Sequence, residues 1–162
     1  MTLAHDTYEG VDLEPPGSRA FIERLIAACG AKPTDHITVA GRRAIRFALD
    51  LCRRGYLQVT CRTESSGSAA ADGPSHSLWI VNVPSETELV AMIGTLGRYL
   101  CAGGRLVLAF EVSISQAHAM RLRQVLAQKG FVARHQSRDR YGRTFLVFYG
   151  RQEEPPASAQ AA

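Results

Sequence analysis

The 162-residue chain has no long apolar segment and no N-terminal pattern of the kind that directs secretion. A membrane-spanning helix needs about 20 consecutive apolar residues, and no apolar run in this sequence approaches that length. Residues 1–9 contain neither a basic start nor an apolar block, which are the marks of a secretory signal. We therefore expect a cytoplasmic protein with no membrane partner.

Closely spaced metal ligands are also absent. The four cysteines, at positions 29, 52, 61 and 101, form no C-x-x-C pair, and zinc sites are usually built from such pairs. We expect no metal site, and we expect the cysteines to be reduced, buried side chains. The five histidines are scattered, and the sequence contains neither a P-loop nor a serine nucleophile elbow.

Lysine is scarce, since Lys32 and Lys129 are the only two, and arginine supplies nearly all of the positive charge. Arginine favours bidentate contacts with phosphate or carboxylate groups. However, arginine in place of lysine, together with abundant alanine, is also typical of a GC-rich bacterial genome. The net charge of +4 is therefore weak evidence for a nucleic-acid partner.

Helix and strand signals alternate along the chain. Apolar runs of helical spacing are separated by glycine or proline from shorter, continuous apolar runs. We expect helices at 18–29, 42–54, 85–100 and 116–129, and strands at 36–40, 56–61, 78–83, 105–112, 131–136 and 144–149. This order predicts an α/β fold with a mostly parallel sheet covered on both faces. The last two strands form a C-terminal hairpin that adds an antiparallel strand.

The segment from Leu100 to Leu108, with the sequence LCAGGRLVL, predicts a helix end, a tight turn at Gly103 and Gly104, and a buried strand. It resembles the L-x-P-G-G-x-L segment of class I S-adenosylmethionine-dependent methyltransferases, with Cys-Ala where Lys-Pro or Arg-Pro is common. The Lys-Gly-Phe sequence at 129–131 resembles the usual join in that family. The resemblance implies a Rossmann-like methyltransferase-type sandwich over residues 17–151, between a flexible leader (1–16) and a disordered tail (152–162).

Two departures from the family pattern indicate a divergent or degenerate member. The family's cofactor loop has an acidic residue and then a glycine-x-glycine-x-glycine run, whereas this chain has Ala40, Gly41, Arg42 and Arg43 after the first strand. Residues 62–77 are too few for another helix–strand–helix unit, so one strand and its helix should be missing. If S-adenosylmethionine binds, the resemblance implies that Ala40, Gly41, Arg42, Asn82 and Glu64 hold it.

Asn82 is the candidate catalytic residue. It stands at the end of the third expected strand, in the sequence Val-Asn-Val-Pro-Ser at 81–85. Amino-methylating members of the family carry Asn or Asp there, followed by Pro-Pro and an aromatic residue, and the side-chain carbonyl orients the target nitrogen. Here the aromatic residue is replaced by Ser85. The alternative is a polar strand end with Pro84 in the first helical turn.

Two groups of arginines are candidates for binding an anion or nucleic acid. On a helical projection of 42–54, the arginines share one face, and the first of them lie at the helix N-terminus, where a bound anion would be stabilising. A second group surrounds Tyr141 in the hairpin, as in sites that grip single-stranded nucleic acid. The candidate residues are Arg42, Arg43, Arg46, Arg138, Arg140 and Arg143. The alternatives are a solvated helix face and a hairpin tip that protects an edge strand.

Three functions follow from these patterns. The first is a methyltransferase-like domain with a degenerate cofactor loop, which lacks catalytic activity and a cofactor and binds a ligand, a protein partner or a second copy of itself. The second is an active S-adenosylmethionine-dependent methyltransferase. The third is a nucleic-acid-binding module that uses the arginine-rich faces.

Overall fold

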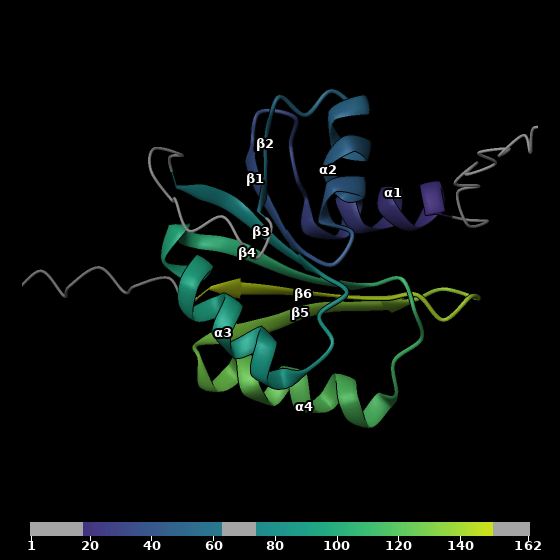
Figure 1. Ribbon diagram of the computed structural model, residues 1–162, viewed down its shortest axis with the longest axis vertical. Helices are drawn as coiled ribbons and strands as arrows, with labels where there is room; N and C mark the ends of the chain where they lie inside the picture. The colour runs from purple at the N-terminus through teal and green to yellow at the C-terminus, as the bar shows by residue number, and fades with distance from the viewer. Residues whose placement is uncertain (1–17, 63–73, 151–162) are drawn as a thin grey trace, which may run out of the picture.

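A computed structural model describes residues 18–62 and 74–150, and it contains one six-stranded sheet with helices on both faces (Figure 1). The strand order is β2-β1-β3-β4-β6-β5. In chain order the elements are α1 (Ser18–Cys29), β1 (His36–Gly41), α2 (Ala44–Arg53), β2 (Gln58–Arg62), β3 (Ser75–Val81), α3 (Glu86–Leu96), the 3-10 turn η1 (Gly97–Tyr99), β4 (Leu100–Phe110), α4 (Gln116–Gln128), β5 (Phe131–Arg138) and β6 (Thr144–Gly150).

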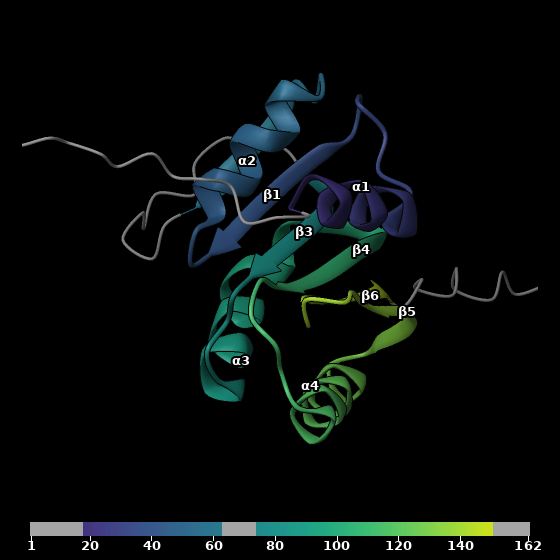
Figure 2. The ribbon, with the colours of Figure 1, turned by 90° about the vertical axis from the view of Figure 1, so that its right-hand side faces the viewer.

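The directions of the strands confirm the expected α/β class. Strands β2, β1, β3 and β4 are parallel, while β6 is antiparallel to both β4 and β5. Helices α1 and α2 cover one face of the sheet, and α3 and α4 cover the other (Figure 2). The central strands are buried on both faces, which explains why their sequences are continuous apolar runs.

Each face of the sheet has its own apolar core. Because successive side chains of a strand point to opposite faces, Trp79 and Val81 of β3 face α1 and α2, while Leu78 and Ile80 face α3 and α4. Serine side chains cap α3 and α4: Ser85 Oγ accepts from the Glu88 backbone N–H, and Ser115 Oγ accepts from that of His118. The two apolar cores hold the strands in place, and with them the strand ends at which a site could form.

Strand β2 forms one edge of the sheet. Within the described residues, no strand pairs with its outer side. Among the described residues β3 is the next element after β2, and residues 63–74 between them are too few for a further helix–strand–helix unit, as the sequence analysis expected. Cys52, on the adjacent helix α2, is exposed, which corrects the expectation that it is buried. The leader, the tail and Glu64 lie outside the described residues.

The prediction for the segment after α3 was right about the buried strand from Arg105 but wrong about the helix end and the tight turn before it. Helix α3 ends at Leu96, and Leu100 already pairs with Ser75 as part of β4. The glycines belong to an irregularity in β4 rather than to a helix end, because the register jumps from the pair Ser75 and Leu100 to the pair Ser77 and Arg105. A Cβ on Gly104 would lie 2.8 Å from the Cys101 carbonyl oxygen and 2.7 Å from the Leu100 side chain, so the backbone path here favours glycine.

Candidate site at the carboxyl edge of the sheet

The carboxyl ends of β1 and β3 lie side by side, with Gly41 in register with Val81. The chain leaves β1 toward β2 and leaves β3 toward β4, so the strand order reverses between them. Ligands of open α/β sheets bind in the crevice at such a reversal. The structure thus brings Ala40, Gly41, Arg42 and Asn82 of the predicted site together here.

The turn after β1 leaves no room beside its one glycine. A Cβ added to Gly41 would lie 2.1 Å from the Val81 carbonyl oxygen, and Gly41 has a φ of +107°. Arg43, the N-cap of α2, has a left-handed φ of 62° and provides no side-chain cap for the helix. Helix α2 begins only at Ala44, so Arg42 and Arg43 belong to the turn and not, as the projection predicted, to the helix.

Asn82 joins the ends of three strands. Its backbone N–H donates to Ala109 O at 2.8 Å, and its side-chain Nδ2 donates to Arg42 O at 3.0 Å and to Glu111 Oε2 at 3.1 Å. Its Oδ1 accepts from the Glu111 backbone N–H at 2.9 Å. The residue has a φ of 52°, a conformation that asparagine tolerates better than most residues. Its amide therefore bridges the crevice between β1 and β3; a catalytic role for Asn82 stays a prediction.

Glu111, directly after β4, was missed by the sequence analysis. Its carboxylate lies 3.4 Å from Arg43 NH1 and 3.6 Å from Arg46 NH1, and its side chain is 17% exposed. The sequence analysis noted that arginines at the start of this helix would be stabilised by an anion, and Glu111 provides one from within the chain. An acidic residue after a buried strand was the available signal, because such a residue lies at the carboxyl edge.

The hairpin between β5 and β6 is held by a buried ion pair. Arg143, which is 4% exposed, donates from Nε to Asp139 Oδ2 at 2.9 Å. Burial opposes ionisation of Asp139, but hydrogen bonds from the backbone and side chain of Arg143 and from the Tyr141 backbone outweigh it, so the pKa of Asp139 is below its usual value. Arg140 and Arg143 both lie over the Tyr141 ring.

The two arginine groups predicted from the sequence meet at this edge. Strand β6 begins opposite the end of β4, where Thr144 pairs with Phe110, so the hairpin tip lies on the same side as the β1–α2 turn. An open hollow of about 240 Å³ has both Arg46 and Arg143 in its lining, beside Glu111. Arg138, next to the tip, donates to Ser113 Oγ. Arg46 and Arg143 thus lie at the same hollow although they are about 100 positions apart, and we use the name arginine-rich rim for the six candidates Arg42, Arg43, Arg46, Arg138, Arg140 and Arg143.

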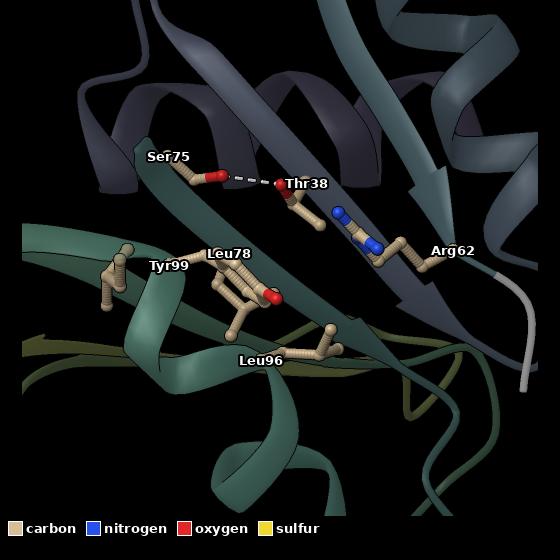
Figure 3. A pocket seen from close by; sticks show the side chains of 7 residues that line it. Thr38, Arg62, Ser75, Leu78, Leu96 and Tyr99 are labelled. Atoms are coloured by element: carbon tan, nitrogen blue, oxygen red, sulfur yellow. Dashed lines mark hydrogen bonds between the residues drawn. The ribbon is translucent and has the colours of Figure 1, made fainter. Parts of the chain in front are cut away.

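A second hollow, of about 280 Å³, lies on the α3 side of the sheet (Figure 3). Thr38 and Ser75 share a hydrogen bond on its floor, and the Arg62 guanidinium lies over the Tyr99 ring at 5.3 Å. Among the described residues, no buried side-chain N or O atom is left without a hydrogen-bond partner. The buried hydroxyls of this hollow, on Thr38 and Ser75, are thus satisfied by each other, and none of the predicted site residues lines it.

Metal-binding and membrane-spanning features are absent from the part of the chain that the structure describes. No group of three or more His, Cys, Asp or Glu side chains is arranged to hold a metal ion. None of the helices in residues 18–62 and 74–150 is long and apolar enough to cross a membrane.

Comparison with known proteins identifies the fold. No protein-family model and no curated protein matches the chain by sequence. Among solved structures, the chain is similar to magnesium protoporphyrin IX methyltransferase from Synechocystis with bound SAH, at a TM-score of 0.57 and 16% identity over 83% of this chain and 84% of that one. It is similar to the N-methyltransferase NodS from Bradyrhizobium japonicum (TM-score 0.52, 12% identity, 85% and 98% covered). It is also similar to the release-factor-specific protein-(glutamine-N5) methyltransferase from Alicyclobacillus acidocaldarius, at a TM-score of 0.52 and 19% identity over 86% of this chain and 94% of that one. The chain therefore has the fold of class I S-adenosylmethionine-dependent methyltransferases, as the sequence resemblance implied.

Proposed function

We propose that this protein is a methyltransferase-like domain that does not transfer methyl groups and acts by binding a ligand or a partner. One observation supports this most strongly: the crevice between β1 and β3 is bridged by the chain's own hydrogen bonds. Asn82 Nδ2 donates across it to Arg42 O, and the Glu111 carboxylate, which accepts a second bond from Nδ2, pairs with Arg43 of the turn after β1. A nucleoside cofactor seated there would have to displace these bonds.

The turn itself adds two further arguments. Glycines let a backbone approach a ligand closely, but the single glycine at position 41 faces the Val81 carbonyl oxygen instead. The Arg43 side chain follows at once and is directed to Glu111. The residues present therefore do not fit a sulfonium nucleoside laid against this backbone.

Thermal unfolding with S-adenosylmethionine or its demethylated product tests the proposal. A ligand at one hundred times its Kd stabilises the folded state by about 2.7 kcal/mol, which is readily seen as a higher Tm. We expect no change in Tm at millimolar concentrations of either nucleoside. A clear rise, supported by a crystal with the nucleoside seated beside Gly41, would contradict the proposal.

An active methyltransferase is the second candidate, favoured by the fold it shares with an enzyme solved with bound SAH. On that view the 40–43 turn and Glu64 would hold S-adenosylmethionine, and Asn82 would position the acceptor. Catalysis by in-line transfer would depend mainly on proximity and orientation. The same titration separates this candidate from the first.

Nucleic-acid binding is the third candidate, favoured by the arginine-rich rim. Both arginine groups reach one edge of the sheet, and Tyr141, which is 47% exposed, lies among them. Exposed aromatic rings beside arginine can stack on bases while the cations contact phosphate. A mobility shift with single-stranded DNA or RNA that weakens as salt is raised would support it, and the absence of any shift at low salt would exclude it.

A further inference from the structure

Positive charge is concentrated in the segment that contains α4, β5 and β6. Residues 112–150 include seven Lys or Arg residues and a single acidic residue, Asp139. The other 123 residues include twelve Lys or Arg residues and fourteen Asp or Glu residues. The net positive charge of the chain therefore comes from this segment, which would attract a partner of opposite charge.

The edge strand β5 gathers several of these charges. It is the last strand of the sheet, and in the part of the chain that the structure describes it pairs with β6 alone. Figure 2 shows it between α1 and α4, and both helices contact it: Arg24 of α1 donates to Ser137 Oγ, and Arg123 of α4 donates to Gln136 Oε1 at 3.3 Å. We define the β5 surface as the exposed residues Arg24, Arg123, Arg134, His135 and Arg138.

The arginines of the β5 surface differ from those of the arginine-rich rim in their partners. In the rim, Arg43 and Arg46 pair with Glu111, and Arg143 pairs with Asp139. Within residues 18–62 and 74–150, no arginine of the β5 surface forms an ion pair. Hydroxyl groups, an amide and aromatic rings hold them instead. Their charge is thus left for a ligand to neutralise.

A β-bulge turns two neighbouring planar side chains of β5 toward the same face of the sheet. The register with β6 shifts between Ala133 and His135, so Arg134 is the extra residue. The Arg134 guanidinium lies 5.6 Å from the centre of the Tyr149 ring. The His135 ring stacks on Phe145, with centroids 5.7 Å apart and planes inclined by 26°. Because both residues are exposed, the outer face of each planar group is open to a ligand.

Unpaired cations beside open planar groups are typical of surfaces that bind single-stranded nucleic acid. Unpaired bases stack on imidazole and guanidinium planes, while the phosphates contact neighbouring arginines. An acidic protein or an anionic membrane would be attracted by the charge alone. The eight residues of β5 extend about 27 Å, a length that suits a site of about four nucleotides or more.

We propose that the β5 surface binds single-stranded nucleic acid. Bases stack on Arg134 and His135 on the α1 side of the edge. Phosphates contact Arg24 on that side and Arg123 and Arg138 on the α4 side. This inference rests on the proposed function, in which the domain acts by binding, and it places the nucleic-acid site on β5 and not on the arginine-rich rim.

Fluorescence anisotropy with labelled single strands of about 12 nucleotides, RNA and DNA in separate arms, tests the proposal. Binding of either strand at about 50 mM salt is the expected result. Arg134→Gln with Arg138→Gln should weaken it at least about tenfold and reduce the slope of log affinity against log salt by about 1.4, the value for two lost phosphate contacts. Arg53→Gln with Arg98→Gln removes the same charge from α2 and η1, and should change the affinity less than about twofold.

His135 provides a second readout, because stacking does not depend on salt in the same way. His135→Ala should weaken binding about fivefold or more and leave the salt slope unchanged, whereas His135→Tyr keeps a planar ring and should retain the affinity. A loss of charge alone would not separate these two variants. Thermal unfolding of each variant verifies that it is folded.

Three results would overturn the proposal. The first is no binding of either strand at low salt, and the second is equal weakening by the two double-arginine variants. The third is competition by polyglutamate that is as strong as competition by unlabelled nucleic acid, since the surface would then recognise charge alone. None of these results alters the titration with S-adenosylmethionine, and a higher Tm in that titration would contradict the proposed function without affecting binding at β5.

Discussion

At the carboxyl edge of the sheet the side chains bind one another, whereas at the flank formed by α2 and β2 they do not. At the carboxyl edge, polar side chains are tied to one another: Asn82 to Glu111, Glu111 to Arg43 and Arg46, and Asp139 to Arg143. At the flank, apolar side chains of α2 are left in solvent within the described structure. Within the described residues, the molecule is therefore closed at the crevice between β1 and β3 and open at the outer side of β2.

The two surfaces therefore differ in whether their side chains stabilise the fold or are available to bind a partner. Side chains that are engaged in several mutual hydrogen bonds stabilise the fold, and they would have to be released before they could bind a ligand. Exposed apolar side chains contribute little to the stability of the isolated fold, but they gain when a partner covers them. Substitutions at the carboxyl edge should therefore lower the free energy of unfolding. Substitutions at the flank should instead change contacts with a partner and have little effect on the free energy of unfolding.

The largest effect is expected for Asn82→Ala. The substitution removes three side-chain hydrogen bonds and puts alanine at a left-handed φ, so it should lower the free energy of unfolding by about 3 kcal/mol. Asn82→Gly is the matched variant, because it loses the same bonds without the backbone penalty and should cost about 1 kcal/mol less. Urea unfolding measures both. A change below about 1 kcal/mol for Asn82→Ala would show that the crevice is not held by this amide.

Asp139→Asn should cost about 2 kcal/mol at neutral pH, because it weakens a buried ion pair. The pKa of Asp139 is lowered in the folded state, so its contribution is complete above the pKa of about 4 in the unfolded chain. That contribution is lost as the pH falls through the lower folded-state pKa. The variant should therefore converge with the wild type in acid. Unfolding curves from pH 7 to 2 measure the gap, and a constant gap would contradict the assignment.

Periodicity and turn residues predicted the order and type of the elements well. The alternation of buried runs and amphipathic helices is local information, and the parallel sheet follows from it. The boundaries at Leu100 and Arg42 were predicted less well. At Leu100 the register with Ser75 decides the structure, and at Arg42 the close approach of Gly41 to Val81 decides it. Both are tertiary contacts, which a local pattern does not contain.

The site was predicted in part for the same reason. The turn residues Gly41 and Arg42 and the strand end Asn82 were found, because strand ends are visible in the sequence. Glu111 was missed, since its importance depends on reaching Asn82 from a strand 29 residues further along the chain. The sequence shows that Ile45 and Leu49 of α2 are apolar, but it does not show that the sheet ends before it reaches them.

A moderate effect is expected for Glu111→Gln. The amide keeps the size of the side chain and an oxygen that can accept from Asn82, but it loses the charge that pairs with Arg43 and Arg46. Because these pairs are partly exposed, the cost should be about 1 kcal/mol and should shrink at high salt. Unfolding in low and high salt measures it. Arg53→Gln, which removes an exposed pair with Asp50, is the control and should change stability by less than about 0.5 kcal/mol.

The smallest effect is expected at the flank, for Leu49→Ala. Half of this side chain is in solvent, so truncating it removes little buried surface and should lower the free energy of unfolding by no more than about 1 kcal/mol. Leu51→Ala, two residues further on the same helix, removes a fully buried side chain and should cost about 3 kcal/mol. The pair has the same chemistry and almost the same helix position, so the difference between the two costs measures only what covers each side chain. Equal costs would mean that the flank is packed as tightly as the core, and the contrast between the two surfaces would fail.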